Sequence, residues 1–412
     1  MTPRAALDGI AVADFSRVLA GPYATMMLAD FGADVIKIER PGGGDDTRAW
    51  GPPFDVDGQA TYFNSVNRNK RSVVLDLRSD EGVAQAREIV RGADIVVENF
   101  RAGTMERMGL GYEQLRAIRP DLIYCAITGF GDSQGADLPG YDLLVQAVGG
   151  LMSITGPESG SPTKVGVAVV DVLTGLHALS GILTALHYRD VTGQGQKVET
   201  NLLSTLLSSL VNQASAYVGA GVIPGILGNR HPSIAPYEVF QTADRPLVLA
   251  VGNDKQFRAL VRALGCEWLA DSKLYADNVS RVQNRETLFA ELSERLATRG
   301  SDDWFAILSE VGVPTGPIND IGQAFNLAKR LGLDTTVEIA GSAAPQVANP
   351  IRMSITPPQY RLSPPRLSND DVQAATDIGI IRPMFCGSTS QDKSPVGKSQ
   401  SHVSEAQPAP TA

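Results

Sequence analysis

Short runs rich in β-branched residues alternate with helix-like stretches over residues 10–128. Parallel strands need a crossover connection, usually a helix, so this alternation is typical of a parallel sheet covered by helices. The first part of the chain is therefore predicted to be an α/β domain with a Rossmann-like, doubly wound parallel sheet. The expected strands are residues 10–15, 34–38, 72–77, 94–98 and 122–127, and the expected helices are residues 23–31, 80–90 and 112–118.

The remainder of the chain predicts a second domain and a return to the first. Before a stretch rich in Gly and Pro, the pattern predicts a helix at 171–189, a strand at 196–200 and a helix at 202–218. After that stretch it predicts a hairpin at 237–241 and 246–251 and helices at 254–264, 285–298 and 302–311. The last predicted elements are short strands at 316–320 and 337–354 and a proline-rich strip at 357–365. We expect a large domain at 1–218, a linker at 219–236, a small α+β domain at 237–315, a return to the large domain at 316–379, and a tail at 380–412 that is too polar to fold.

The charge and the cysteine content limit the kinds of partner and of site that this chain is expected to have. A net charge of −9 repels phosphate backbones and anionic membranes, so neither nucleic acid nor a membrane is an expected partner. Three widely spaced cysteines and four histidines without ligand spacing predict neither a disulfide framework nor a metal site. Because we find no signal peptide and no apolar run of about 18 residues, a cytoplasmic location is expected.

Three familiar motifs do not account for a site in this chain. Residues 131–135 match G-x-S-x-G, but Gly135, Pro139 and Gly140 follow where a nucleophile elbow needs a helix, so a surface loop is predicted. No G-x-G-x-x-G follows the first strand and no phosphate-binding P-loop occurs. The predicted parallel sheet must therefore serve a ligand other than those of the common nucleotide loops.

Basic residues gather near the predicted strand ends. The carboxyl ends of parallel strands form the ligand crevice of an open α/β sheet, so arginines there suit a phosphate-rich ligand. Solvated surface charge is the alternative for each residue taken singly. The cluster consists of Arg17, Arg40, Arg68, Lys70, Arg71, Arg78, Arg101 and Arg107.

Asp171 stands at the predicted start of the helix at 171–189. As an N-cap it would satisfy backbone N–H groups of the helix. As a nucleophile it would be kept ionised by the helix dipole, ready to attack an electrophilic carbonyl. The residues alone leave both roles open.

Many segments in order resemble the class III CoA-transferases, which include formyl-CoA and carnitine CoA-transferases and the related α-methylacyl-CoA racemase. The resemblance runs from about residue 7 to about residue 371. Its segments include Leu7-Asp8-Gly9-Ile10, Leu19-Ala20-Gly21-Pro22, Gly32-Ala33-Asp34-Val35, Asn69-Lys70-Arg71-Ser72, Val97-Glu98-Asn99-Phe100, Gly140-Tyr141-Asp142, Gly193-Gln194-Gly195-Gln196 and Val313-Pro314-Thr315-Gly316-Pro317.

The resemblance implies that Asp171 is the catalytic carboxylate of a CoA-transferase, which would form an aspartyl-CoA thioester. It implies an acyl-CoA and a small carboxylic acid as substrates, no permanently bound cofactor, and an interlocked homodimer. The residues that it implies for CoA binding are Leu19, Ala20, Arg40, Leu75, Asp76, Leu77, Arg78, Asn99, Phe100, Arg107, Tyr141 and Asp142.

Position 141 separates transfer from racemisation. The related racemase has a histidine there in a Gly-His-Asp motif, whereas this chain has Tyr141, and an ordinary tyrosine is a poor base at neutral pH. Transfer is therefore expected, with a racemase or a CoA-binding relative without activity as the alternatives. The sequence also has Ser368-Asn369-Asp370-Asp371 where many family members carry a Gly-Glu-His-Thr-like motif.

Overall fold

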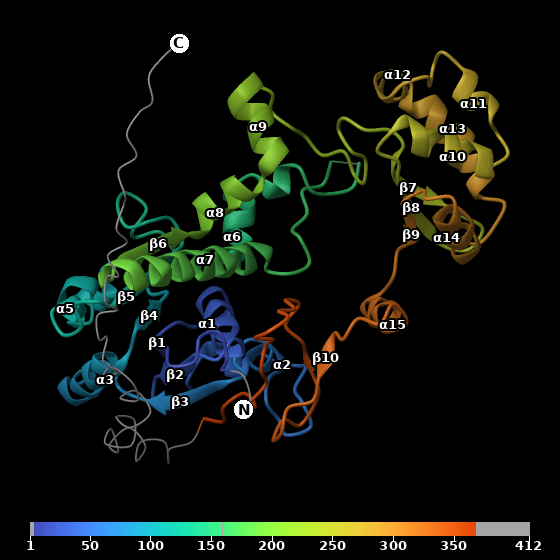
Figure 1. The fold of residues 1–412 in the computed structure, drawn as a ribbon. Coiled ribbons are helices and arrows are strands. Elements are labelled where there is room, and N and C mark those ends of the chain that lie inside the picture. The colour runs from blue at the N-terminus through green and yellow to red at the C-terminus, as the bar shows by residue number, and fades with distance from the viewer. Residues whose placement is uncertain (1–3, 159, 368–412) are drawn as a thin grey trace, which may run out of the picture.

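The computed structural model describes residues 4–158 and 160–367, and its centre is a six-stranded parallel sheet (Figure 1). The strand order is β3-β2-β1-β4-β5-β6. This order is that of a Rossmann-type sheet and confirms the predicted doubly wound α/β architecture. The strands are β1 (Ala11–Asp14), β2 (Asp34–Glu39), β3 (Lys70–Val74), β4 (Ile95–Glu98), β5 (Ile123–Thr128) and β6 (Lys197–Asn201).

Helices cover both faces of this sheet because its strands are apolar on both faces. Along β1, Val12 belongs to one hydrophobic core and Ala13 to the other, as the alternation of side chains in a strand requires. The first core is closed by α1 (Ala20–Asp30), α6 (Asp142–Val148), α7 (Val169–Thr192) and α8 (Leu202–Ser209). The second is closed by α3 (Asp80–Gly92), α4 (Thr104–Arg107) and α5 (Tyr112–Arg116).

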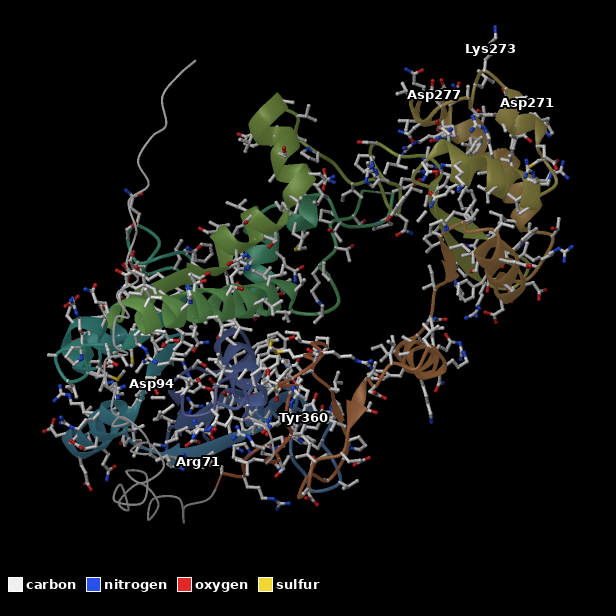
Figure 2. The ribbon with its side chains drawn as sticks, in the orientation of Figure 1. Arg71, Asp94, Asp271, Lys273, Asp277 and Tyr360 are labelled. Carbon is white, nitrogen blue, oxygen red and sulfur yellow. The ribbon has the colours of Figure 1, made fainter. Side chains whose placement is uncertain are left out.

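A second body of structure is built on the antiparallel sheet β7-β8-β9. It has its own apolar core, in which Phe240, Leu260 and Leu292 are fully buried. Asp271, Lys273 and Asp277 lie at its outer end, far from Arg71 and Asp94 on the six-stranded sheet (Figure 2). Its elements are β7 (Tyr237–Gln241), β8 (Pro246–Ala250), α10 (Asp254–Ala263), α11 (Trp268–Asp271), α12 (Asn278–Gln283), α13 (Arg285–Leu296), α14 (Ser301–Glu310) and β9 (Thr315–Pro317).

Two segments join the two bodies (Figure 1). One follows α9 (Val211–Ala220), and the other contains α15 (Ile321–Arg330), β10 (Thr336–Val337) and β11 (Gln346–Val347). The chain then returns along α1, where the Gln359 N–H donates to the Asp30 carbonyl at 2.7 Å and the Asn69 N–H donates to the Leu362 carbonyl at 2.8 Å. The proline-rich strip is thus tied to the large sheet by backbone hydrogen bonds.

Several predicted boundaries are wrong by a few residues. The strand expected at 72–77 spans Lys70–Val74, because Lys70 is buried against Asp14 and the chain turns at Asp76 to enter α3. The helix expected at 23–31 begins at Ala20, with Pro22 in its first turn, where a missing N–H costs nothing.

Other predictions merged or missed elements. The helix expected at 202–218 is two helices, α8 and α9, separated where Val211 takes a positive φ of 42°. Helix α15 was not predicted, although Asp320 and Gln323 form a complete capping box at its start. The residues 368–371 and the tail predicted to be disordered lie outside the described residues.

Helix α7 corrects the statement that no apolar run is long enough to span a membrane. Over the described residues it is the one helix whose length and composition would allow a crossing. Val170, Ala178 and Ile182 nevertheless lie in the core that α7 shares with α1. Such burial is typical of the central helix of a doubly wound domain.

Candidate active site

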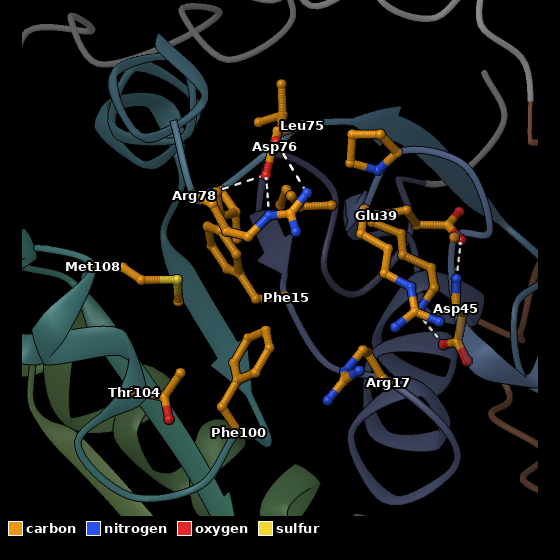
Figure 3. Close-up of a pocket in the computed structure, with 16 residues that line it drawn as sticks. Phe15, Arg17, Glu39, Asp45, Leu75, Asp76, Arg78, Phe100, Thr104 and Met108 are labelled. Carbon is orange, nitrogen blue, oxygen red and sulfur yellow. Dashed lines mark hydrogen bonds and ion pairs between the residues drawn. The ribbon is translucent and has the colours of Figure 1, made fainter. Parts of the chain in front are cut away.

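Two cavities open at the carboxyl ends of the strands, beside the switch point between β1 and β4. The outer cavity, of about 410 Å³, lies over β2 and β3 and is walled by Phe15, Leu75, Arg78 and Met108 (Figure 3). The inner cavity, of about 270 Å³, reaches Asp171. Arg17 and Phe100 line both cavities, so the two meet at the ends of β1 and β4.

Most of the residues implied for CoA binding line one of these two cavities. The outer cavity contains Arg40, Leu75, Asp76, Leu77, Arg78 and Phe100. The inner cavity contains Leu19, Ala20, Asn99, Phe100, Tyr141 and Asp171. Arg107 and Asp142 line neither cavity; Arg107 instead donates to the hydroxyl of Thr104, which does line the outer cavity, at 2.9 Å. The structure thus brings residues from six separate segments to one edge of the sheet.

Asp171 is not the helix cap that the sequence suggested. Helix α7 begins two residues earlier, at Val169, and its N-cap position is Ala168. Asp171 lies in the first turn, and its carboxylate accepts no hydrogen bond from any described residue. A carboxylate on a helix N-terminus without an internal partner is available to a ligand.

Asp142 takes over the capping role. Its Oδ1 accepts from the N–H groups of Val170 at 2.8 Å and Asp171 at 3.3 Å, and its Oδ2 accepts from Gln146 at 2.6 Å. This side chain at the start of α6 therefore fixes the first turn of α7. The short helix α6 is absent from the sequence-based prediction, so this contact between α6 and α7 was not expected.

Burial and the neighbouring carboxylate of Asp142 raise the pKa of Asp171 to about 7. This direction is opposite to the expectation that the helix dipole keeps Asp171 ionised. Burial and the like charge of Asp142 both favour the neutral carboxyl. The ionised form of Asp171, which is the nucleophilic form, carries its charge in a partly desolvated site.

Tyr62 is a neighbour of Asp171 that sequence reasoning missed. It lies on α2 (Thr61–Asn64), and its ring meets Trp50 edge-on with centroids 5.4 Å apart. Burial, Asp171 and Asp142 raise the pKa of Tyr62 to about 12, so its hydroxyl stays protonated at neutral pH. The segment from Trp50 to Tyr62 contains no motif that distinguishes it from a surface loop.

The loop after β1 forms a wall of both cavities and is held by buried charges. Val18 takes a positive φ of 70°, and its N–H faces the Asp45 carboxylate at 3.2 and 3.3 Å. Lys37, fully buried, pairs with Asp45 at 2.8 Å and donates to the Ser16 carbonyl at 2.8 Å. Burial opposes ionisation of Asp45, but Lys37 outweighs it and holds the pKa of Asp45 at about 2. This ion pair stabilises a backbone conformation that a β-branched residue rarely adopts.

Apart from Arg107, which lines neither cavity, the predicted basic cluster divides into two groups. Arg17, Arg40, Arg78 and Arg101 line the cavities. The other group lies at the opposite end of β3 and is structural: Arg68 holds Asp30, Lys70 holds Asp14, and Arg71 holds Asp34. The prediction started β3 two residues too late, at residue 72 instead of Lys70. It therefore could not show that these three residues lie at the start of the strand and not at the end that faces the cavities.

The G-x-S-x-G segment is a loop, as predicted. Helix α6 begins only at Asp142, well after Ser133, and Gly131 and Gly135 line the inner cavity. Within residues 4–158 and 160–367, no group of three or more His, Cys, Asp or Glu side chains is placed to hold a metal ion.

The fold and its cavities define a doubly wound α/β protein with an extended ligand crevice at the switch point of its sheet. The chain belongs to CoA-transferase family III, whose model matches residues 7–371. The family assignment predicted from the motifs is therefore confirmed, and the protein is a CoA-transferase by class.

Individual relatives agree with this assignment. The chain is 45% identical to a succinate–glutarate CoA-transferase of Agrobacterium fabrum, over 91% of this chain and 96% of that protein. It is 39% identical to an acetyl-CoA:oxalate CoA-transferase of Acetobacter aceti, over 89% and 94% of the two chains. A crystal structure of a CAIB/BAIF family protein from Brucella suis matches with a TM-score of 0.82 and 41% identity, over 91% of this chain and all of that one.

Proposed function

We propose that this protein transfers CoA from an acyl-CoA to a carboxylic acid through an aspartyl-CoA thioester on Asp171. The observation that supports this most directly is the free carboxylate of Asp171 in the inner cavity, at the end of the crevice that begins among the arginines of the outer cavity. The crevice thus has a carboxylate at one end and arginines at the other. This arrangement suits CoA thioesters, which carry the reactive carbonyl at one end and phosphates at the other.

Four steps complete the exchange. The Asp171 carboxylate attacks the thioester carbonyl, expels the CoA thiolate and forms a mixed anhydride with the acyl group. The thiolate then attacks the Asp171 carbonyl, which gives aspartyl-CoA and releases the first acid. A second acid attacks this thioester, again expelling the thiolate and forming an anhydride. The thiolate finally attacks the acyl carbonyl, which yields the new acyl-CoA and frees Asp171.

The surroundings of Asp171 suit these intermediates. Anhydrides and thioesters react with water, so a productive site must exclude it. Leu19, Ala20, Ile127 and Leu202 are apolar residues that line the same cavity as Asp171. The hydroxyl of Tyr62 stays protonated at neutral pH, because burial and the charges of Asp171 and Asp142 raise its pKa to about 12.

We propose dicarboxylic acids as the acids exchanged, with succinyl-CoA as donor and glutarate as the first acceptor to assay. This proposal follows from the relatives, which include a succinate–glutarate CoA-transferase and an acetyl-CoA:oxalate CoA-transferase. The test incubates the protein with succinyl-CoA and glutarate, oxalate, acetate or butyrate, and follows the new acyl-CoA by liquid chromatography. Preference for monocarboxylates would contradict the choice of substrate class.

The same assay tests the role of Asp171. We expect Asp171→Asn to lose at least about 10³-fold in transfer rate, since a neutral amide cannot form the anhydride. Arg91→Gln, a change at an exposed position on α3, is the matched control and should keep full activity. Racemisation would instead show as exchange of the α-proton of a branched acyl-CoA in deuterated water without an acceptor acid.

We also propose that the chain acts as an interlocked homodimer. Helix α9 buries no residue within the chain, and Val218 and Ile223 are more than four-fifths exposed. Helix α7 exposes Leu183, Tyr188 and Val191 on its outer side. Apolar surface of this extent on a water-soluble chain is normally covered by a partner, and a second copy fits because two separate segments join the two bodies of each chain. The cytoplasmic location stays a prediction.

A further inference from the structure

Arg17 occupies the junction of the two cavities. It is one of two residues that line both, and in the close-up it lies opposite Phe100 across the mouth of the outer cavity (Figure 3). The family resemblance did not assign it to the CoA-binding set, and in the sequence it was only one of eight clustered basic residues. Its position in the structure singles it out.

The backbone of Arg17 is clamped in place by Asn99. The Arg17 N–H donates to Asn99 Oδ1 at 2.8 Å, and Asn99 Nδ2 donates to the Arg17 carbonyl at 2.7 Å. The guanidinium lies over the Phe100 ring, with Cζ 5.2 Å from the ring centroid. Stacking on a ring fixes the plane of a guanidinium and leaves its N–H edge free for a ligand.

The donors of this guanidinium are only partly used. Nη1 donates to Asp46 at 3.2 Å, and the same carboxylate accepts from Arg40. Asp46 therefore holds two guanidinium groups side by side with a net positive charge. Nε of Arg17 is buried and has no hydrogen-bond partner among the described residues. Nη2 donates to no described residue, so the guanidinium keeps a donor for a ligand at the junction of the cavities.

We propose that Arg17 binds the diphosphate of CoA where the molecule crosses from the outer to the inner cavity. This inference rests on the proposed function, because it places the thioester at Asp171. The order of groups along CoA is nucleotide, diphosphate, pantetheine and thioester. With the nucleotide among Arg40 and Arg78 and the thioester at Asp171, the diphosphate is the group that passes the junction. The 3′-phosphate and the acyl carboxylate belong to opposite ends of the crevice.

A binding experiment tests this without turnover. Calorimetric titration of CoA and of dephospho-CoA, which lacks only the 3′-phosphate, is carried out on the wild type, Arg17→Gln and the control Arg91→Gln. We expect Arg17→Gln to weaken both ligands by the same factor, about 10- to 100-fold, as for a lost charge-assisted hydrogen bond. Unchanged affinity for CoA would overturn the proposal. So would a penalty that disappears with dephospho-CoA, since Arg17 would then bind the 3′-phosphate.

Steady-state kinetics with two thioesters separates the diphosphate from the acyl end. For succinyl-CoA, Arg17→Gln should raise KM about 10- to 100-fold and keep kcat, because the diphosphate is bound equally in the ground and transition states. For succinyl-pantetheine, which has no phosphate, KM and kcat should match those of the wild type, which also demonstrates correct folding. An equal loss with both thioesters would overturn the proposal by placing Arg17 at the acyl group.

The two proposals can fail separately. If the wild type bound CoA but transferred it to no acid, the proposed function would be wrong, while the two titrations would still decide the role of Arg17. If transfer occurred and Arg17→Gln bound CoA normally, only the inference about Arg17 would be wrong.

Discussion

At the residue scale, two carboxylates near one helix end have different tasks. Asp142 is engaged by two backbone N–H groups of α7 and by Gln146, whereas Asp171 accepts nothing from the described residues. Fixing the helix with one carboxylate leaves the other available to a substrate. Burial, together with the like charge of Asp142, raises the pKa of Asp171 to about 7.

This pKa predicts a pH dependence. Only ionised Asp171 can attack a thioester, so kcat/KM for the acyl-CoA should increase with pH and level off above about pH 7. Well below this value the rate should fall about tenfold per pH unit. The measurement is the initial rate of transfer between pH 5 and pH 9, with stability checked at each pH. A rate that is flat from pH 5 upward would show that Asp171 titrates at an ordinary carboxyl pKa.

Asp142→Asn provides the control for that profile. The asparagine oxygen can still accept hydrogen bonds from the N–H groups of α7. The like charge beside Asp171, which contributes to its raised pKa, is gone. The midpoint of the profile should therefore move to lower pH. If the midpoint of the pH profile did not move, burial alone would account for the raised pKa of Asp171.

At the scale of elements, the crevice depends on the loop between β1 and α1. Lys37 on β2 holds Asp45, and Asp45 receives the N–H of Val18 in its strained conformation. Because both charges are fully buried, the Lys37–Asp45 pair adds little to the net stability of the fold. We infer that its role is to hold the conformation of this loop. The wall shared by both cavities is thus positioned from the neighbouring strand.

Removing Lys37 should be strongly destabilising. Lys37→Met leaves Asp45 and Asp14 buried without one of their counter-ions, which typically costs about 3–5 kcal/mol. Urea unfolding followed by circular dichroism measures this loss, with the exposed Lys329→Met on α15 as the matched control. A loss below about 1 kcal/mol would show that the loop does not depend on this pair.

The candidate site was predictable only in part at this scale. The motifs placed Arg40, Arg78 and Asn99 after predicted strands, and parallel topology brings such ends together. Arg68, Lys70 and Arg71 share the same local composition but lie at the other end of β3, where they form ion pairs. The role of Asp142 depends on α6 meeting α7, a tertiary contact with no local sequence signal.

At the scale of the whole molecule, the alternating pattern of the first 128 residues was enough to predict the sheet. Burial on both faces imposes near-continuous apolar strands, so β1, β2, β4 and β5 were visible in the sequence. The segment of short elements from α15 to β11 was harder to predict, because no residue of α15 is buried within the chain. Segments that pack on no core of their own leave little hydrophobic periodicity to detect.

The exposed apolar helices make a prediction about assembly. Light scattering after size exclusion should give twice the mass of one chain, because the proposed homodimer would cover α7 and α9 with a second copy. Val218→Asp should reduce the dimer fraction, since it places a charge on α9 at a position more than four-fifths exposed in the single chain. Val279→Asp on α12, near the outer end of the second body, is the control. A monomeric wild type would refute the proposed homodimer.

The central claim is that Asp171 becomes covalently attached to CoA during transfer. The most direct measurement mixes the protein with succinyl-CoA, traps the activated carboxyl with hydroxylamine, and locates the modification by mass spectrometry of peptides. The account predicts an aspartyl hydroxamate at Asp171 in the wild type and in Arg91→Gln, and none without succinyl-CoA or in Asp171→Ala. An Asp171 peptide that stays unmodified while transfer to glutarate proceeds, or full transfer activity in Asp171→Ala, would contradict it.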